Sequence, residues 1–160
     1  PSFVTVGSKD KLAQCLALGA SSGSVRHDGS FLAKAQEWAG PNGVDVILDP
    51  VGASYLADNL TVLGMGGRLV LIGLMGGIQS EVNLALLMMK RARVIGSTLR
   101  ARPVAEKTVV MQGLLHDVWP KIEAGEIRPV IDAQFSIQEM QTAHELMVGN
   151  GTVGKIVLSV

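Results

Sequence analysis

The sequence predicts an α/β domain built on a doubly wound parallel sheet. Short β-type runs alternate with segments of helical spacing along the 160 residues, which is the pattern of repeated βαβ units. Two of the runs, at residues 44–48 and 68–72, are apolar almost throughout, as expected for strands that are covered on both faces of a parallel sheet. Nearly every run ends in a glycine or a hydroxyl residue.

Each element is predicted from its periodicity and its end signals. The predicted strands span residues 3–6, 23–25, 44–48, 68–72, 93–96, 130–135 and 155–160. The predicted helices span residues 9–18, 30–39, 53–63, 84–91, 104–118 and 136–148. Polar side chains that are expected to open helices as N-caps are Asp28 or Ser30, Asn83 and Ser136. Glycines that are expected to close helices are Gly19, Gly40 and Gly64.

Composition excludes several classes of protein. Fourteen Lys and Arg balance fourteen Asp and Glu, which argues against a protein that coats nucleic acid or binds membranes through a basic surface. The single Cys15 excludes an intramolecular disulfide framework and a cysteine-rich zinc site. No apolar run approaches the ~20 residues of a membrane span. We therefore expect a cytoplasmic protein without a membrane partner.

Metal-ligand spacing is also lacking, because His27, His116 and His144 lie far apart in the chain. Five basic residues without an intervening acid are a separate feature: Lys90, Arg91, Arg93, Arg100 and Arg102. A helix end that carries cations is the favoured interpretation of this run. An RNA-binding patch is the alternative and is left open.

Glycine is abundant, at 19 residues, and recurs in the loops that follow the predicted strands, at 7–8, 49–52, 73–77 and 97–100. In an open parallel sheet ligands bind at the carboxyl ends of the strands. A ligand that packs against backbone is the favoured explanation, because Gly76 and Gly77 follow Gly73 more densely than a turn requires. The alternative is that these glycines only allow turns.

The glycine-rich fingerprint of dinucleotide-binding sheets is missing. Gly64, Gly66 and Gly67 have the wrong spacing and precede a strand instead of following one. In the strand order 3-2-1-4-5-6 the fingerprint follows strand 1. If residues 3–6 are strand 2, the chain begins just after the helix that the fingerprint opens. Together with the start at Pro1, this predicts an incomplete Rossmann-type sheet, a fragment without the first strand and the Gly-rich turn.

The loop after strand 2 predicts which dinucleotide is bound. Proteins that bind NAD place an acid there for the ribose hydroxyls, whereas NADP requires space and cationic or hydroxyl donors. Here Gly7 replaces the acid, Ser8 is a donor, and Lys9 or Lys11 supplies charge. The pattern favours NADP(H). The alternative makes Ser8 an N-cap and the lysines solvated surface residues.

Several segments resemble the zinc-independent quinone oxidoreductases of the medium-chain dehydrogenase/reductase superfamily, especially the p53-inducible quinone oxidoreductase-like branch. The segments that carry the resemblance are VTVGS at 4–8 with Lys11, LGA at 18–20, VDVILD at 44–49, GRLVLIGLMGG at 67–77, GSTLRAR at 96–102 and GKIVL at 154–158. They span almost the whole chain but match only the C-terminal part of such enzymes. The segments GLMGG and GSTLRAR are the specific ones.

The resemblance implies where NADPH contacts fall. Gly7, Ser8 and Lys11 correspond to the contacts of the adenosine phosphate, and Val51 to the adenosine-side wall. The residues implied near the nicotinamide half are Gly73, Leu74 and Met75, with Thr98, Leu99 and Arg100 beside them. A further implied contact, Asn150, comes from the loop before the last strand. Arg26 stands where relatives usually have a tyrosine; it either binds the phosphate through its guanidinium or is a surface residue.

The implied parent protein is an NADPH:quinone oxidoreductase that delivers a hydride to a quinone or a related α,β-unsaturated carbonyl. Residues 1–128 are expected to form a partial dinucleotide-binding domain, and 129–160 a segment that returns toward an absent GroES-like catalytic domain. A homodimer that pairs near residues 93–98 is also implied. This chain alone is expected to be inactive, because turnover requires the full-length protein. The lack of an evident acid, base or nucleophile is no objection to hydride transfer, since the cofactor carries the chemistry.

The alternatives are an enoyl reductase of the same superfamily and a non-enzymatic dinucleotide- or RNA-binding module. A short-chain dehydrogenase is disfavoured because the only tyrosine, Tyr55, has Asn59 four residues later instead of lysine. The glycosylation sequon at 59–61 falls in a predicted helix and is interpreted as coincidence.

Overall fold

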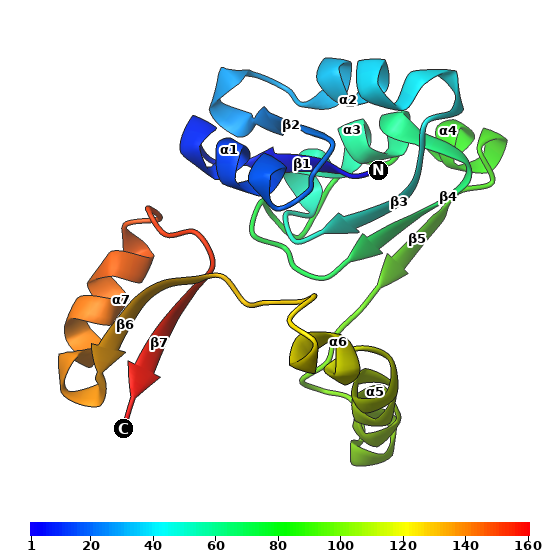
Figure 1. The fold of residues 1–160 in the computed structure, drawn as a ribbon. Helices are drawn as coiled ribbons and strands as arrows, with labels where there is room; N and C mark the ends of the chain where they lie inside the picture. Colours follow the sequence, from blue (N-terminus) through cyan, green and yellow to red (C-terminus); the bar gives the residue numbers. More distant parts are fainter. The chain divides into compact units, whose positions relative to one another are not determined.

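The computed structural model describes residues 1–160. The chain divides into two compact units, residues 1–100 and 101–160, which are described separately (Figure 1). The strands are β1 (Phe3–Val6), β2 (Ser22–Val25), β3 (Val44–Asp49), β4 (Leu63–Leu71), β5 (Arg93–Gly96), β6 (Ile131–Ser136) and β7 (Lys155–Ser159). The helices are α1 (Lys9–Ala17), α2 (Leu32–Ala39), α3 (Leu56–Val62), α4 (Leu84–Met89), α5 (Val104–Asp117), α6 (Trp119–Glu123) and α7 (Met140–Val148).

The strands pair in parallel throughout, which confirms the predicted fold class. In the first unit β1 pairs with β2, and β3, β4 and β5 form a separate sheet in that order. In the second unit β6 pairs with β7. The predicted strand order leaves the position between β1 and β3 for strand 1, and the structure does not pair these two strands.

The core of the first unit lies between its strands and the helices α2, α3 and α4. One cluster is centred on the buried Phe31, Ala35 and Val62, with Phe3 of β1 and Ile47 of β3 packed against it. A second cluster joins the buried side chains of Leu60, Leu63 and Leu69 to α4. Because Ile47 contributes to both clusters, one continuous apolar layer connects β1 to β3.

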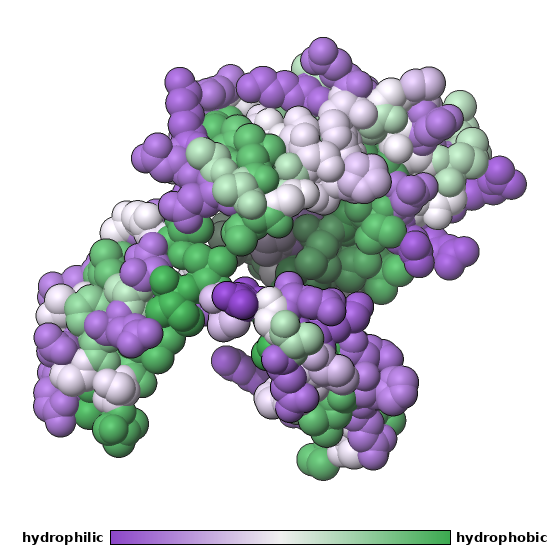
Figure 2. All heavy atoms as spheres, in the orientation of Figure 1, coloured by the Kyte–Doolittle hydropathy of each residue, from purple (hydrophilic) through white to green (hydrophobic).

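The other face of β3 is apolar but exposed. Val46 and Leu48 keep 47% and 65% of their surface accessible, and hydrophobic side chains gather where Figure 1 shows β3 to β5 (Figure 2). In contrast, Leu69 on the covered face of β4 is 0% exposed. The sheet is therefore covered by this unit's helices on one face only.

One predicted boundary is wrong, because strand pairing replaces the end of a helix. The helix expected at 53–63 is a 3-10 turn (Ala53–Tyr55) followed by α3, which ends at Val62. Leu63 instead begins β4, where it pairs with Val44 and is almost fully buried. The strand expected at 68–72 thus starts five residues earlier than predicted.

Two other helix ends differ from the prediction. Helix α2 begins at Leu32, whose backbone N–H donates to the Ser30 hydroxyl at 3.1 Å. Helix α4 is capped as predicted by Asn83, which accepts from Leu86 N at 3.1 Å. It ends at Met89 instead of at residue 91, because Arg91 adopts a left-handed conformation with φ of 51°.

In the second unit, Ser136 and Glu139 form a capping box ahead of α7. The Glu139 carboxylate accepts hydrogen bonds from the backbone N–H and the hydroxyl of Ser136, and these bonds lower the pKa of Glu139. No helix in either unit has the length and apolar character that crossing a membrane requires. The division at 128/129 stays a prediction.

Candidate dinucleotide-binding edge

The residues that the sequence assigns to the adenosine phosphate lie together where β1 and β2 end. The pairing of Val6 with Val25 places Gly7 beside Arg26. A Cβ on Gly7 would lie 3.4 Å from Arg26 Nη2, an ordinary van der Waals distance, so the guanidinium lies directly beside the backbone of Gly7. Ser8 opens α1 as its N-cap, and its hydroxyl accepts from Lys11 N at 3.3 Å.

Arg26 is exposed and begins a short 3-10 turn (Arg26–Asp28) directly after β2. Its Nε donates to His27 Nε2 at 3.4 Å. No acidic side chain lies within ion-pair distance of this guanidinium. A planar cation with donor groups available to a ligand therefore lies next to the N-terminus of α1, where helix geometry also favours anions.

The second part of the edge is the loop after β3, which is organised by Asp49. This side chain is only 2% exposed. Its Oδ1 accepts from Val51 N at 2.6 Å and from Gly52 N at 3.2 Å, and its Oδ2 accepts from Asn59 Nδ2 at 3.0 Å. The carboxylate thus fixes the turn that carries Val51, the predicted adenosine-side wall.

Backbone hydrogen bonds join this loop to the loop after β4. Between the segments 49–53 and 72–77 the donors and acceptors are Ile72 N to Asp49 O (2.9 Å), Met75 N to Pro50 O (3.2 Å), Gly76 N to Val51 O (2.6 Å) and Ala53 N to Gly77 O (3.1 Å). These four bonds hold the two loops together, and we name the segments 49–53 and 72–77 the paired loops.

Close packing inside the paired loops explains their glycines. A Cβ on Gly73 would lie 2.7 Å from Pro50 O, and one on Gly52 would lie 2.8 Å from Leu74 Cδ2. A Cβ on Gly76 would overlap Ser54 Oγ. The dense glycines that favour a ligand in the sequence are therefore required by contacts within the chain, and they are no longer evidence for the ligand.

Apolar side chains project from the same edge. Leu74 and Met75 are 50% and 78% exposed at the tip of the paired loops. Residues 98–100 follow β5, and the preceding Ser97 N donates to Leu71 O at 2.9 Å. This bond brings the start of the 98–100 segment to the start of the 72–77 loop.

Asn150, the remaining predicted contact, belongs to the second unit. It lies between α7 and β7 in a left-handed conformation with φ of 54°, and its Nδ2 donates to Val148 O at 3.3 Å. Asn150 therefore belongs to the turn before β7, and its contact with the cofactor stays a prediction.

Comparison with known proteins gives the family. The family model described as "Zinc-binding dehydrogenase" matches residues 5–158. The chain belongs to the zinc-binding dehydrogenase family. This description names the family and not a metal in the chain, in which no group of three or more His, Cys, Asp or Glu lies together in a metal-holding arrangement.

Curated proteins that are similar to this family member include quinone oxidoreductases. The human enzyme is 28% identical over 155 residues, which cover 96% of this chain and 45% of its own length. The mouse enzyme is 31% identical over 157 residues, which cover 96% and 46%. The chain thus spans less than half the length of these relatives.

Solved structures show the same fold. The quinone oxidoreductase of Thermus thermophilus, described also in complex with NADPH, has a TM-score of 0.81 and 26% identity, with 99% of this chain and 49% of that chain covered. An NAD-dependent alcohol dehydrogenase has a TM-score of 0.80 and 25% identity, with 99% and 43% covered. These neighbours confirm the Rossmann-type fold of this family member.

Sequence reasoning on this family member missed the buried pair Asp49 and Asn59. Asn59 is 3% exposed, so the sequon at 59–61 lies inside the protein and its interpretation as coincidence is consistent with the structure. A signal was present in the sequence: an acid directly after a buried strand, followed by a helix with an amide on its apolar face. Such polar residues in apolar positions are expected to bond to each other.

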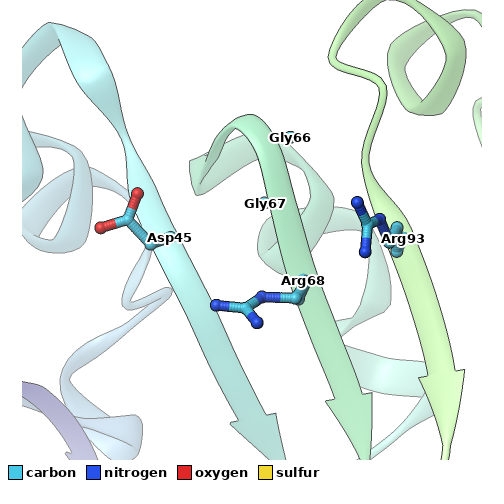
Figure 3. A pocket seen from close by; sticks show the side chains of 5 residues that line it. All are labelled: Asp45, Gly66, Gly67, Arg68 and Arg93. Carbon is cyan, nitrogen blue, oxygen red and sulfur yellow. The ribbon is translucent and has the colours of Figure 1, made fainter.

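A hollow of about 390 Å³ lies at the opposite end of the sheet, lined by Asp45, Gly66, Gly67, Arg68 and Arg93 (Figure 3). Lys90 is also at this end, but its ammonium donates to three backbone carbonyls. Of the five basic residues in the run 90–102, Arg93 thus lines the hollow, whereas Lys90 is engaged by backbone carbonyls.

Proposed function

We propose that this chain is the NADPH-binding portion of an oxidoreductase that transfers a hydride from NADPH to a quinone or a related α,β-unsaturated carbonyl. The observation that carries the proposal is the placement of Gly7, Ser8 and Arg26 together where β1 and β2 end. The similarity to quinone oxidoreductases supports the acceptor class. The chain's coverage of less than half of these relatives leaves turnover to the whole protein.

The 2′-phosphate is the part of NADPH that this cluster recognises. A carboxylate at position 7 would repel the phosphate, whereas Gly7 carries no charge and has the guanidinium of Arg26 beside it. Arg26 supplies a planar pair of donors that matches phosphate oxygens, and the Ser8 hydroxyl and Lys11 add a donor and a positive charge. Lys11 and Arg26 come from α1 and from the turn after β2, so they approach the phosphate from two elements.

The paired loops hold the remainder of the dinucleotide. Val51 forms the adenosine-side wall, and Gly73, Leu74 and Met75 face the nicotinamide half, with Thr98, Leu99 and Arg100 beside them. NADPH supplies the hydride when it is bound, and the acceptor takes up a proton to complete a two-electron reduction. The exposed side chains of Leu74 and Met75 exclude water from the reacting face.

The rest of the protein follows from the same proposal. Residues 1–128 form the dinucleotide-binding part, and residues 129–160, which include Asn150, return toward a catalytic domain. Two copies pair through the free edge of β5, around residues 93–98, in a cytoplasmic enzyme. The reaction requires no metal, and this chain alone binds NADPH without turnover.

Titration of the chain with NADPH and with NADH, followed by thermal unfolding, tests the binding part. We expect a rise in Tm with both cofactors, because each binds the folded chain, and a larger rise with NADPH, because only NADPH carries the 2′-phosphate. No rise with either cofactor contradicts the proposal, and a larger rise with NADH contradicts the assignment of the phosphate site.

The acceptor is tested with the protein as it is naturally produced. Loss of NADPH absorbance is expected with a para-quinone and not in its absence. Faster turnover of an enoyl thioester than of the quinone would favour an enoyl reductase instead. NADPH binding without turnover of either acceptor would favour a non-enzymatic module.

A further inference from the structure

We propose that Asp49 and Asn59 are a buried donor–acceptor pair that positions the paired loops for the dinucleotide. The inference rests on the proposed function, because it names residues that act through the cofactor-contacting ones without touching the cofactor themselves. Asp49 is the last residue of β3, and Asn59 lies on α3, the α-helix that follows this strand. Both side chains are almost fully buried, with exposed fractions of 2% and 3%.

The hydrogen bonds of Asp49 explain how it acts at a distance. Its carboxylate accepts from the backbone N–H groups of Val51 and Gly52, at 2.6 and 3.2 Å. The carbonyl of Val51 in turn accepts from Gly76 N, and that of Pro50 accepts from Met75 N. A displacement of the turn at 50–52 is therefore transmitted to both loops.

Asn59 determines how the carboxylate is oriented. Its Nδ2 donates to Asp49 Oδ2 at 3.0 Å, which leaves Oδ1 directed at Val51 N and Gly52 N. No lysine or arginine forms an ion pair with Asp49, so only hydrogen bonds compensate for its burial. Removing one of these bonds leaves the buried carboxylate with fewer donors to compensate for its charge, which is costly.

The backbone of the turn makes this support necessary. Gly52 has φ of +82° and is itself buried against Leu74. Its N–H donates to both carboxylate oxygens of Asp49, and the distance from Gly52 N to each oxygen is 3.2 Å. The pair Asp49 and Asn59 thus holds a left-handed turn under the exposed Leu74 and Met75.

A reciprocal exchange separates this positioning from the effect of charge. Asp49→Asn alone places two amide groups opposite each other, and Asn59→Asp alone places two carboxylates opposite each other. In the double variant Asp49→Asn with Asn59→Asp, the amide introduced at position 49 donates to the carboxylate introduced at position 59, and its oxygen accepts from Val51 N and Gly52 N. The double variant also keeps one negative charge within the buried pair, now at position 59.

The dissociation constant of NADPH is measured for the wild-type protein, the two single variants and the double variant, well below their melting temperatures. We expect each single variant to raise the Kd by about tenfold, the equivalent of ~1.4 kcal/mol, and the double variant to recover most of this loss. Asp45→Asn is the matched control, because it makes the same chemical change on the same strand at an exposed side chain (Figure 3). It is expected to leave the Kd unchanged.

A lower Tm with an unchanged Kd in both single variants would show a merely structural role and overturn the inference. If Asp49→Asn does not fold, Asn59→Ala replaces it, since that change removes only one of the hydrogen bonds of the carboxylate. A wild-type protein that binds no NADPH would instead overturn the proposed function.

Amide hydrogen exchange of Val51 and Gly52 provides a readout that needs no cofactor. Exchange is expected to be slow in the wild-type protein, fast in each single variant and slow again in the double variant. Fast exchange in the double variant would contradict the donor–acceptor pairing even if NADPH binding is retained.

Discussion

The two ends of the β3–β4 pair are held by side chains of opposite charge. At the carboxyl end the buried Asp49 accepts hydrogen bonds from backbone N–H groups. At the amino end the Lys90 ammonium donates hydrogen bonds to three backbone carbonyls, Leu60 O at 3.0 Å and Thr61 O and Leu63 O at 2.6 Å. Burial lowers the pKa of Lys90, and its three acceptors replace the water that it loses.

Glycines are packed closely at both ends. At the amino end a Cβ on Gly43 would lie 2.7 Å from Val62 O, and one on Gly64 would overlap Asn42 O. At the carboxyl end Gly73 and Gly76 are equally confined. The carboxyl end differs in the guanidinium of Arg26, which lies after β2 beside Gly7. Glycine density therefore indicates close packing at both ends, and the groups around the glycines have to identify a binding edge.

The largest effect on stability is expected from Gly64→Ala. The added Cβ meets the carbonyl of Asn42, which is backbone and cannot rotate away, so we expect a loss of about 3 kcal/mol in the free energy of unfolding. Urea unfolding measures it. Gly96→Ala is the control, because a Cβ there has no neighbour within 4 Å. Equal stability of the two variants would contradict the packing argument for the amino end.

A smaller loss is expected from Lys90→Met, which keeps most of the length of the side chain but removes its three donors. Loss of these bonds at the end of α3 is expected to cost about 1–2 kcal/mol, while the Kd of NADPH stays within about twofold, a change of less than ~0.5 kcal/mol. The exposed Lys34→Met is the control for the change in charge. A weakened NADPH affinity in Lys90→Met would show that the two ends are not independent.

The smallest effect is expected at the capping box of the second unit. There the exposed carboxylate of Glu139 accepts from a backbone N–H, as the buried carboxylate of Asp49 does in the first unit. Hydrogen bonds from Ser136 lower the pKa of Glu139 below its usual 4.5. The stabilisation is therefore complete above this usual value and is lost as the pH falls through the lowered pKa. Amide exchange in α7 as a function of pH measures it, and Glu139→Gln is expected to remove the dependence. A dependence that survives this substitution must come from another group.

Much of the fold could be predicted from the sequence, because its signals are local. The apolar run ending at Asp49 and the N-caps Asn83 and Ser136 are all found as expected. The start of β4 was not predictable in this way. Leu63 continues a helical pattern in the sequence, and only its pairing with Val44 across the sheet makes it a strand residue.

The site was predicted in part for the same reason. Gly7 and Ser8 are adjacent in the sequence. Their position directly after the first strand of the chain, β1, can be inferred from the order of the elements along the sequence. The contact between Gly7 and Arg26 depends on the register of β1 against β2, and the bond between Asp49 and Asn59 depends on the docking of α3. The Gly7–Arg26 contact and the Asp49–Asn59 hydrogen bond each join residues whose spacing in the sequence matches no known motif.

The measurement that tests the account most directly is the ratio of the Kd of NADH to that of NADPH, in the wild-type protein and in Arg26→Gln. We expect the wild-type protein to prefer NADPH, and Arg26→Gln to reduce this ratio by about tenfold, ~1.4 kcal/mol, chiefly through weaker binding of NADPH. Arg68→Gln, which changes an exposed arginine at the opposite end of the sheet (Figure 3), is expected to leave the ratio unchanged. Equal affinity of the wild-type protein for the two cofactors, or an unchanged ratio in Arg26→Gln, would contradict the account.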